Sequence, residues 1–267
     1  MNLRVITLSL KNSNIKYGGA YRRYMELIEG MLSKGWEVHH ISPRGFSNIS
    51  HQNLQHHGVY KIPFRPAYFP FILQAIPQDI FIARKHKTDV LIAFTMFDAF
   101  IGMVARLFSP GLKVVMCDRG NPVAGLEIRL RKRYSAGFLV PFIIPILSLF
   151  QRSVYKKADF VIFNSDARRR QMIEEAKLKP ERLSLIYNNA NPSWVLEKIE
   201  EAAEEAPKIR ERWEERKLII FVGNLFIDGR DISTVLKAFK RVKEETPQAL
   251  LIVVGEGPDK GRILRLA

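Results

Sequence analysis

The chain alternates short apolar runs with stretches in which apolar residues recur every three or four positions. Six runs rich in β-branched and aromatic residues each end near Gly, Pro, Asn, Asp or Ser, as buried parallel strands do. Between the first two runs, apolar positions at helical spacing are followed by Gly35, a helix stop. This alternation predicts an α/β fold with a doubly wound, mainly parallel sheet. The expected strands are Arg4–Leu10, Glu37–Ser42, Val90–Phe94, Lys113–Cys117, Phe160–Asn164 and Leu183–Tyr187, and the helical positions are Tyr21, Tyr24, Met25, Ile28, Met31 and Leu32.

The pattern changes between Trp194 and Lys217, where Glu, Lys and Arg dominate and Pro207 interrupts an exposed helical pattern. The alternation then restarts, with expected strands at Leu218–Val222 and Ala249–Val254. Two strands and one complete helix are too few for a stable doubly wound domain. We therefore expect the second Rossmann-like domain to be partial. The expected divisions are a first domain at 1–195, a charged linker region at 196–217 and the partial domain at 218–267.

The formal net charge of +15 is unevenly distributed. Residues 1–160 hold 22 Lys/Arg and 9 Asp/Glu, a net +13, whereas residues 161–267 hold 20 and 18, a net +2. A general bias toward basic residues would not spare the second part. The asymmetry therefore favours an anionic partner for the first part: a phospholipid surface, a phosphorylated acceptor or a nucleic acid. Since no recognised nucleic-acid-binding module is evident, we expect no nucleic-acid partner.

Cysteine and histidine usage argues against disulfides and metal clusters. Cys117 is the single cysteine, which excludes an intramolecular disulfide and a cysteine-based zinc site and fits a reducing compartment. The pairs His39-His40 and His56-His57 would point to opposite faces of a strand, and the six histidines show no metal-ligand spacing. The sequence therefore predicts no metal, no bound cofactor and a cytoplasmic location.

The longest apolar run, Phe138–Phe150, has 13 residues and contains two prolines. A membrane-spanning helix needs about 20 residues, so we expect that this run does not cross a bilayer alone. Basic residues flank it, which suits a segment lying in a membrane interface, on the inner face of the cell membrane. A helix buried against the sheet explains the run equally simply. The expected membrane-binding or acceptor-binding residues are Arg129, Arg131, Lys132 and Arg133, with Lys156-Lys157 after the run.

Glycine-containing loops follow three of the expected strands. Gly18-Gly19 precede the first helix, whose amino end offers unpaired N–H groups to a phosphate. Gly223-Asn224-Leu225 and Gly255-Glu256-Gly257-Pro258 end the two strands of the second domain, at the edge where open α/β sheets bind ligands. The fingerprint G-x-G-x-x-G is absent, which argues against a nicotinamide dehydrogenase.

In their order along the chain, these elements resemble the family 4 glycosyltransferases, enzymes of the two-domain GT-B fold. The resemblance implies an N-terminal acceptor-side domain and a C-terminal nucleotide-sugar domain, here cut short at its C-terminus. It also implies a retaining transfer from a nucleotide sugar to a sugar or lipid-linked acceptor, in glycan, glycolipid or cell-surface polysaccharide synthesis. The matching stretches are Gly18-Gly19, Ala158–Ile162 with Ser165, Ile186–Asn191, Phe221–Leu225, Ala238-Phe239 and Val253–Pro258.

The resemblance also assigns a diphosphate site. In the family, an Arg and a Lys after the strand that ends in G-R-L stabilise the leaving diphosphate. Here the Arg position is Asn224, which is uncharged, and the Lys position is best matched by Arg230. We therefore expect the 267-residue chain alone not to transfer sugar at an appreciable rate. The expected donor-diphosphate residues are Gly18, Gly19, Gly223, Asn224, Arg230 and Gly255.

Asp118-Arg119 follow the expected strand Lys113–Cys117, near the position where many relatives have a catalytic His. This predicts that Asp118 assists the acceptor hydroxyl and that Arg119 binds phosphate. A structural ion pair or a helix cap explains Asp118 equally well. For the whole chain, the alternative function is that of a non-catalytic remnant that binds an acceptor or an anionic membrane surface. Asn224 and the incomplete second domain favour that alternative.

Overall fold

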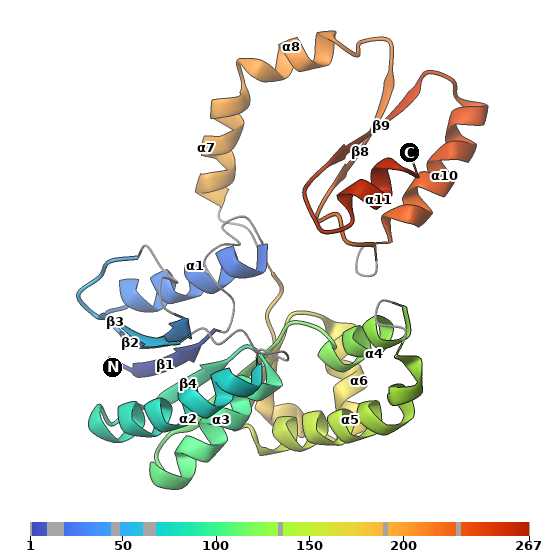
Figure 1. Cartoon of the computed structure of the whole chain (residues 1–267). Coiled ribbons are helices and arrows are strands. Elements are labelled where there is room, and N and C mark those ends of the chain that lie inside the picture. The colour runs from blue at the N-terminus through green and yellow to red at the C-terminus, as the bar shows by residue number, and fades with distance from the viewer. Residues whose placement is uncertain are drawn as a thin grey trace. The chain divides into compact units, whose positions relative to one another are not determined.

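The computed structural model describes residues 2–9, 19–43, 49–60, 68–132, 136–188, 192–227 and 231–266. The chain divides into two compact units. The first is formed by Met1–Asn121 and Pro145–Asn188, and the second by Pro122–Ile144 and Asn189–Ala267. Figure 1 shows the elements of both units, coloured along the chain.

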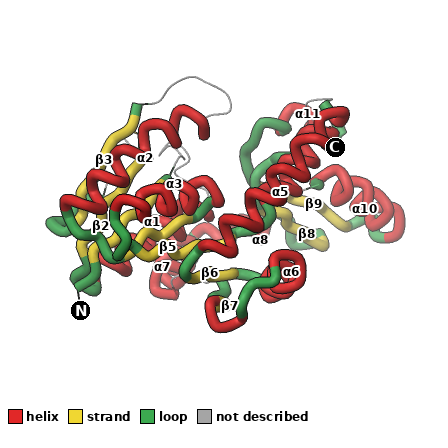
Figure 2. Tube along the Cα trace, turned by 90° about the horizontal axis from the view of Figure 1, so that it is seen from below, coloured by secondary structure: helices red, strands yellow, loops and turns green. Residues whose placement is uncertain are grey.

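The first unit is built on a seven-stranded sheet in which all neighbouring strands are parallel. The strand order is β3-β2-β1-β4-β5-β6-β7, and Figure 2 shows the strands side by side from β3 to β7. The predicted doubly wound, mainly parallel sheet is therefore confirmed. The strands are β1 (Arg4–Leu8), β2 (Glu37–Pro43), β3 (Leu54–Val59), β4 (Val90–Ala93), β5 (Lys113–Asp118), β6 (Phe160–Phe163) and β7 (Leu183–Leu185).

The sequence pattern does not indicate β3. Its residues, Leu54–Val59, include Gln, two His and Gly and form no apolar run. β3 lies at the edge of the sheet and is largely exposed, so hydrogen bonding to β2 maintains it without a continuous apolar face. A search for apolar strands therefore misses it.

Helices cover both faces of the strands β1, β2 and β3, with α1 on one side and α2 and α3 on the other (Figure 1). Crossovers between parallel strands are right-handed, so the side of the sheet that a helix covers depends on the direction in which the chain moves across the sheet. From β1 to β3 the chain moves one way, and from β4 to β7 it moves the other way. The helices of the first unit are α1 (Gly19–Ser33), α2 (Tyr68–Lys85), α3 (Met96–Phe108), α5 (Val140–Lys157) from Pro145 onward and α6 (Asp166–Ala176), with a 3₁₀ turn at Pro180–Arg182.

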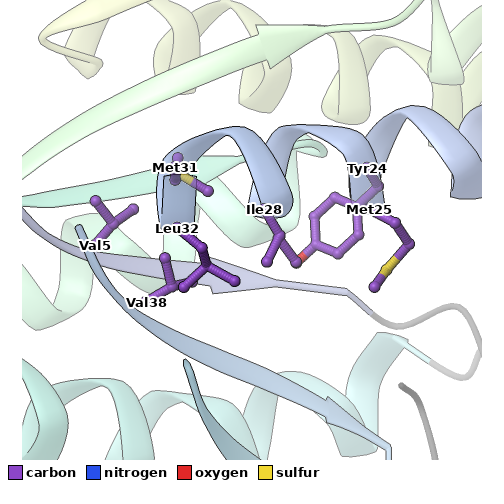
Figure 3. Close-up of a cluster of buried hydrophobic side chains, with 7 residues drawn as sticks. All are labelled: Val5, Tyr24, Met25, Ile28, Met31, Leu32 and Val38. Atoms are coloured by element: carbon purple, nitrogen blue, oxygen red, sulfur yellow. The ribbon is translucent and has the colours of Figure 1, made fainter. Parts of the chain in front are cut away.

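The helical periodicity predicted after the first strand produces the core beneath α1. Buried side chains of α1 pack on one side chain each from β1 and β2 (Figure 3). Each large apolar side chain that is fully buried stabilises the fold by roughly 1.5–3 kcal/mol. The side chain of Tyr21, the first predicted position, lies outside the described residues. The cluster consists of Val5, Tyr24, Met25, Ile28, Met31, Leu32 and Val38.

The apolar run Phe138–Phe150 lies in a 3₁₀ turn, Gly137–Leu139, and in α5, Val140–Lys157. Together they form a helical segment of 21 residues that is long and apolar enough to cross a membrane by length and composition alone. The helix continues past the apolar run, so the length of the run alone understates the length of the helical segment. Only 17% of its most apolar window is buried.

The second unit contains a two-stranded parallel sheet, β8 (Lys217–Val222) and β9 (Ala249–Val254), as predicted. Leu225, Ile232 and Ile263 form its buried core. Most of β8 is exposed. The region expected as a charged linker folds into helices. The helices of this unit are α4 (Pro122–Lys132), α7 (Pro192–Ala202), α8 (Glu205–Glu211), α10 (Ile232–Glu245) and α11 (Lys260–Leu264).

Candidate functional site

The strand order of the first unit reverses between β1 and β4. From β1 the chain proceeds outward to β2 and β3, and from β4 it proceeds outward on the other side to β7. Open α/β sheets bind ligands outside the carboxyl ends of the strands at such a switch point. The connection after β1 leads to Gly19, the first residue of α1, and Gly18 lies outside the described residues. The carboxyl edge at β1 and β4 is therefore the candidate site of this unit.

Three polar side chains from β1, β2 and α1 meet near this edge. Thr7 Oγ1 lies 2.9 Å and Tyr24 Oη 2.7 Å from His40 Nδ1. Burial, followed by the neighbouring His56 and His57, lowers the pKa of His40 to about 3. Burial raises the pKa of Tyr24 well above its ordinary value. At neutral pH the cluster therefore consists of an uncharged imidazole and two hydroxyl groups.

Arg119 and Phe94 extend this cluster along the carboxyl edge. The Phe94 ring follows β4 and packs edge-on against the Tyr24 ring, with a centroid separation of 4.6 Å. The Arg119 guanidinium carbon lies 4.4 Å from the centroid of the Phe94 ring, a cation–π contact. Arg119 therefore places a positive charge beside the ends of β4 and β5, as a phosphate-binding role requires.

Asp98 lies at the amino end of α3, close to the same ring cluster. Its amide donates to Thr95 Oγ1, and Asp98 Oδ2 accepts from the amides of Thr95 and Phe94, at 3.1, 2.9 and 3.3 Å respectively. This capping box satisfies amide groups at the amino end of α3. Burial raises the pKa of Asp98 to about 7, despite these hydrogen bonds. Asp98 therefore titrates near neutral pH at this edge.

Asp118 occupies a different environment from Arg119. The Tyr155 hydroxyl donates to Asp118 Oδ2, Arg168 Nε donates to the same oxygen at 3.3 Å, and the Gly120 amide donates to Asp118 Oδ1 at 2.7 Å. Burial and the charge of Asp118 raise the pKa of Tyr155. Three donors therefore already surround the Asp118 carboxylate. Of the two roles that the sequence allows, assistance to the acceptor hydroxyl and a structural ion pair, the structure favours the ion pair.

The second unit brings the two motif loops together at the carboxyl edge of β8 and β9. The Gly223 amide donates to the Val254 carbonyl, and the Leu225 amide donates to the Glu256 carbonyl, both at 3.0 Å. A Cβ on Gly255 would lie 1.9 Å from Gly223 O, so this contact has no room for a side chain. Gly223, Asn224 and Gly255 are therefore neighbours at the carboxyl edge of β8 and β9. Arg230 lies outside the described residues.

The basic residues predicted to bind a membrane or an acceptor lie on α4, where the structure describes two of their side chains. Arg129 Nε donates to the Gly125 carbonyl at 3.1 Å. Arg131 forms an ion pair with Glu127 at 3.0 Å. The Lys132 side chain and Arg133 lie outside the described residues. Two of the four predicted basic residues, Arg129 and Arg131, therefore lie exposed on α4, and the charge of Arg131 is paired with that of Glu127.

The predicted alternation of the histidines is confirmed at the opposite face of β2. His40 contacts Tyr24 and Thr7, whereas His39 contacts His57. Burial, followed by the charge of His86, lowers the pKa of His39 to about 4, so its ring is neutral at pH 7.

Comparison with known proteins identifies the family. The model of glycosyltransferase family 4 matches residues 17–194, two thirds of the chain, and that of the group 1 glycosyl transferases matches residues 202–267. The chain belongs to glycosyltransferase family 4. The resemblance predicted from the order of the motifs is thus confirmed.

Two curated relatives of this chain are distant and longer. An uncharacterized glycosyltransferase of Methanocaldococcus jannaschii is 25% identical over 187 residues, which are 68% of this chain and 44% of that protein. A Campylobacter jejuni enzyme is 24% identical over 193 residues, which are 70% of this chain and 46% of that protein. Its name is N-acetylgalactosamine-N,N'-diacetylbacillosaminyl-diphospho-undecaprenol 4-alpha-N-acetylgalactosaminyltransferase. The chain spans about half the length of these relatives.

Solved structures share the fold of this chain. Sucrose-phosphate synthase from Thermosynechococcus elongatus superposes with a TM-score of 0.71 at 14% identity, over 95% of this chain and 62% of that one. The Anabaena protein HepE, crystallised in complex with UDP, superposes with a TM-score of 0.57 at 16% identity, over the whole chain and 64% of HepE. The GT-B architecture is therefore shown by structure as well as by sequence.

Sequence reasoning missed Tyr24, His40, Phe94 and Asp98 as members of the candidate site. For Asp98 a local signal exists, since Thr95-x-x-Asp98 directly after a strand has the pattern of a capping box. In the sequence pattern, Tyr24 is one of the apolar positions of the first helix and Phe94 is the last residue of an expected strand, so neither indicates a site. Their proximity to Arg119 depends on the order of β1, β4 and β5, which local patterns do not contain.

Proposed function

We propose that this protein transfers a sugar from a nucleotide-sugar donor to an acceptor, with retention of anomeric configuration, in the synthesis of a glycan, glycolipid or cell-surface polysaccharide. The observation that carries the proposal is the packing of the loops Gly223–Leu225 and Gly255–Gly257, backbone against backbone, at the carboxyl edge of β8 and β9. Closely packed glycine loops leave backbone, rather than side chains, at the strand edge where the proposal places the diphosphate. The donor is a substrate, and the proposal includes no resident cofactor.

The acceptor side of the proposal rests on Arg119. Its guanidinium, held over Phe94 at the carboxyl edge of the first unit, supplies a fixed charge for an anionic acceptor. The name of the Campylobacter relative specifies a diphospho-undecaprenol acceptor, whose diphosphate group is negatively charged. We include in the proposal a sugar or lipid-linked acceptor with a phosphate group. Asp118 then positions the β5–α4 connection, because its carboxylate accepts from Gly120, Tyr155 and Arg168.

Replacement of Asn224 by arginine is expected to raise the rate of nucleoside diphosphate release by about 100-fold or more. Losing one electrostatic contact to the developing charge costs a factor of about 100–1,000 in rate, and Asn224 stands where the family has an arginine. Purified chain is incubated with a panel of nucleotide sugars and lipid diphosphate acceptors, and the released diphosphate is measured. Release by the unmodified chain is expected near background.

The matched control for this experiment is Asn224→Arg combined with Arg230→Ala, which is expected to return release to background. If the unmodified chain released diphosphate rapidly and Arg230→Ala abolished the release, Asn224 would not limit the rate, and the prediction would be wrong. If neither the chain nor Asn224→Arg released diphosphate from any donor, catalysis by this chain would be excluded. The alternative of a non-catalytic, acceptor-binding remnant would then stand.

We also propose that α5 binds an anionic membrane surface peripherally, on the cytoplasmic side. Phe138, Phe142, Ile146 and Leu149 recur at helical spacing on one face and are 68–72% exposed. Basic residues at the carboxyl end of the helix, including Lys156-Lys157, are also exposed. The carboxyl-terminal part of the helix is fixed to the sheet, since the buried Tyr155 ring packs near Phe163 of β6 and its hydroxyl donates to Asp118 of β5. A helix attached in this way favours a position in the interface rather than across the bilayer.

Co-sedimentation with vesicles is expected to show binding to anionic lipid that weakens as salt rises, and little binding to zwitterionic lipid. The double substitution Phe142→Gln, Ile146→Gln should weaken binding by roughly tenfold or more, because the stripe loses its buried apolar area. Leu196→Gln, at a position of α7 that is 60% exposed, is the control and should bind normally. Equal binding to both lipids, or self-association without vesicles, would contradict the membrane proposal.

A further inference from the structure

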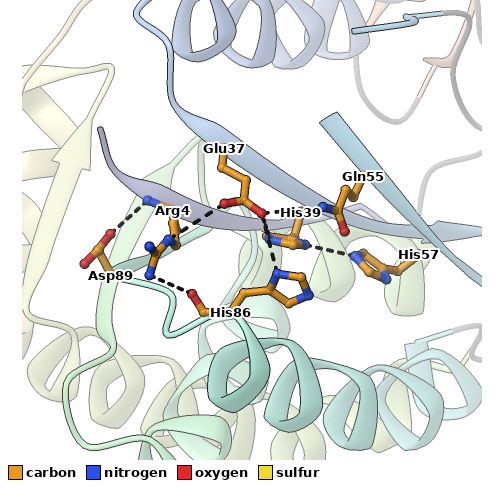
Figure 4. A network of polar contacts seen from close by, with 7 residues as sticks. All are labelled: Arg4, Glu37, His39, Gln55, His57, His86 and Asp89. Atoms are coloured by element: carbon orange, nitrogen blue, oxygen red, sulfur yellow. Dashed lines mark hydrogen bonds and ion pairs between the residues drawn. The ribbon is translucent and has the colours of Figure 1, made fainter. Parts of the chain in front are cut away.

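Three potential metal ligands meet at the amino edge of the seven-stranded sheet, opposite the edge discussed above (Figure 4). Glu37 and His39 belong to the start of β2, and His86 follows the end of α2. Glu37 Oε1 lies 3.1 Å from His39 Nε2 and 3.5 Å from His86 Nδ1. One ligand atom from each residue lies within 4.8 Å of the other two. The set consists of two imidazoles and one carboxylate.

These separations fit one coordination sphere. Zn²⁺ binds imidazole nitrogen and carboxylate oxygen at about 2.0–2.1 Å in tetrahedral sites, which places two ligand atoms roughly 3.3 Å apart. The separations of 3.1 and 3.5 Å from Glu37 Oε1 lie on either side of this value. Two of the three separations therefore match one coordination sphere, and the ligand atoms of all three residues lie within 4.8 Å of one another.

His57 supplies the supporting contact that histidine ligands usually have. Its Nε2 lies 3.1 Å from His39 Nδ1, the ring nitrogen that faces away from Glu37. With an ion on His39 Nε2, the ring proton resides on Nδ1 and is donated to His57 Nε2, and the proton of His57 then resides on its own Nδ1. Such a partner fixes the tautomer and the orientation of the ligating ring.

Arg4 holds the other two ligands in place. Its Nε lies 3.7 Å from Glu37 Oε2, the oxygen that points away from the histidines, and its Nη1 donates to the His86 carbonyl at 3.1 Å. The Arg4 amide donates to Asp89 Oδ2 at 2.8 Å, which anchors this strand end. Glu37 Oε1 therefore faces His39 and His86. Gln55 Nε2 also donates to this oxygen, at 3.5 Å.

We propose that Glu37, His39 and His86 bind one divalent transition-metal ion, best matched by zinc, with His57 orienting His39 and water completing the coordination. The ion can enter from solvent, because the Glu37 and His86 side chains are 33% and 20% exposed. The buried His39 forms the floor of the site. Because the site lies at the amino edge, it would join β2 to the end of α2 and take no part in sugar transfer.

The proposal is tested by titrating the metal-free 267-residue chain with Zn²⁺ in a calorimeter. One ion per chain is expected, with a rise in the melting temperature. His86→Ala and Glu37→Gln should each weaken binding by about tenfold to 100-fold or more, and His57→Ala by a smaller factor within that range. The control His51→Ala removes an exposed histidine outside the cluster and should bind like the unmodified chain.

Two further readings separate a metal site from a purely hydrogen-bonded histidine network. Co²⁺ should give the visible absorption of a tetrahedral site in the chain and in His51→Ala, but not in His86→Ala. Circular dichroism of each metal-free variant establishes that it is folded. The absence of saturable binding, or binding weakened as much by His51→Ala as by His86→Ala, would overturn the proposal.

Discussion

Replacement of Arg168 by methionine is expected to destabilise the seven-stranded unit by about 3–5 kcal/mol. The Arg168 and Asp118 side chains are 8% and 0% exposed, and removing one partner of a buried ion pair leaves the other charge without compensation. The Tyr155 hydroxyl and the Gly120 amide would remain on Asp118, but neither carries a positive charge. Urea unfolding monitored by circular dichroism at pH 7 measures the change.

The control for this prediction is Arg169→Met, one position further along α6. Arg169 pairs with Asp166 at the surface, and exposed ion pairs contribute about 0–1 kcal/mol. Asp118→Asn tests the other side of the pair. If Asp118 served only as a catalytic group, Asp118→Asn would leave the free energy of unfolding unchanged. A structural role predicts a loss similar to that of Arg168→Met, and a double mutant less destabilised than the sum of the two.

Replacement of Gly255 by alanine is expected to separate the two motif loops of the second unit and to cost about 3 kcal/mol or more. The new Cβ would lie 1.9 Å from Gly223 O, a backbone atom that cannot move without disturbing β8. The backbone of Gly255 also has φ +153°, a conformation that residues with a side chain rarely adopt. Overpacking typically costs about 1–3 kcal/mol, and the backbone strain adds to it.

Amide hydrogen exchange locates this effect. Faster exchange is expected at Gly223 and Leu225, whose amides donate across the two loops, with no change in the first unit. Gly261→Ala is the matched control, because its Cβ would meet only the Arg265 side chain at 3.9 Å and because alanine favours helix α11. Unchanged protection at Gly223 and Leu225 in Gly255→Ala would refute the proposed packing of the loops.

The candidate site was predicted only in part from the sequence. Arg119, Gly223 and Gly255 were indicated because each follows an apolar strand, and the ends of strands are visible in a local pattern. Asp118 was indicated by the same pattern, but whether its carboxylate faces a substrate or an ion-pair partner depends on Arg168, 50 residues away. No spacing rule connects two residues on different strands and helices.

The alternation of apolar runs and helical periods was sufficient to determine the fold class, because it encodes which face of each element is buried. It also fixed the helix face Tyr24–Leu32 and the motif loops at the ends of β8 and β9. Only the tertiary structure decided the edge strand β3, whose polar residues carry no burial signal. The same holds for the meeting of Glu37 with His86, since it depends on strand order and register. Those are set by packing over the whole sheet, and a period of 2 or 3.6 residues contains no information about them.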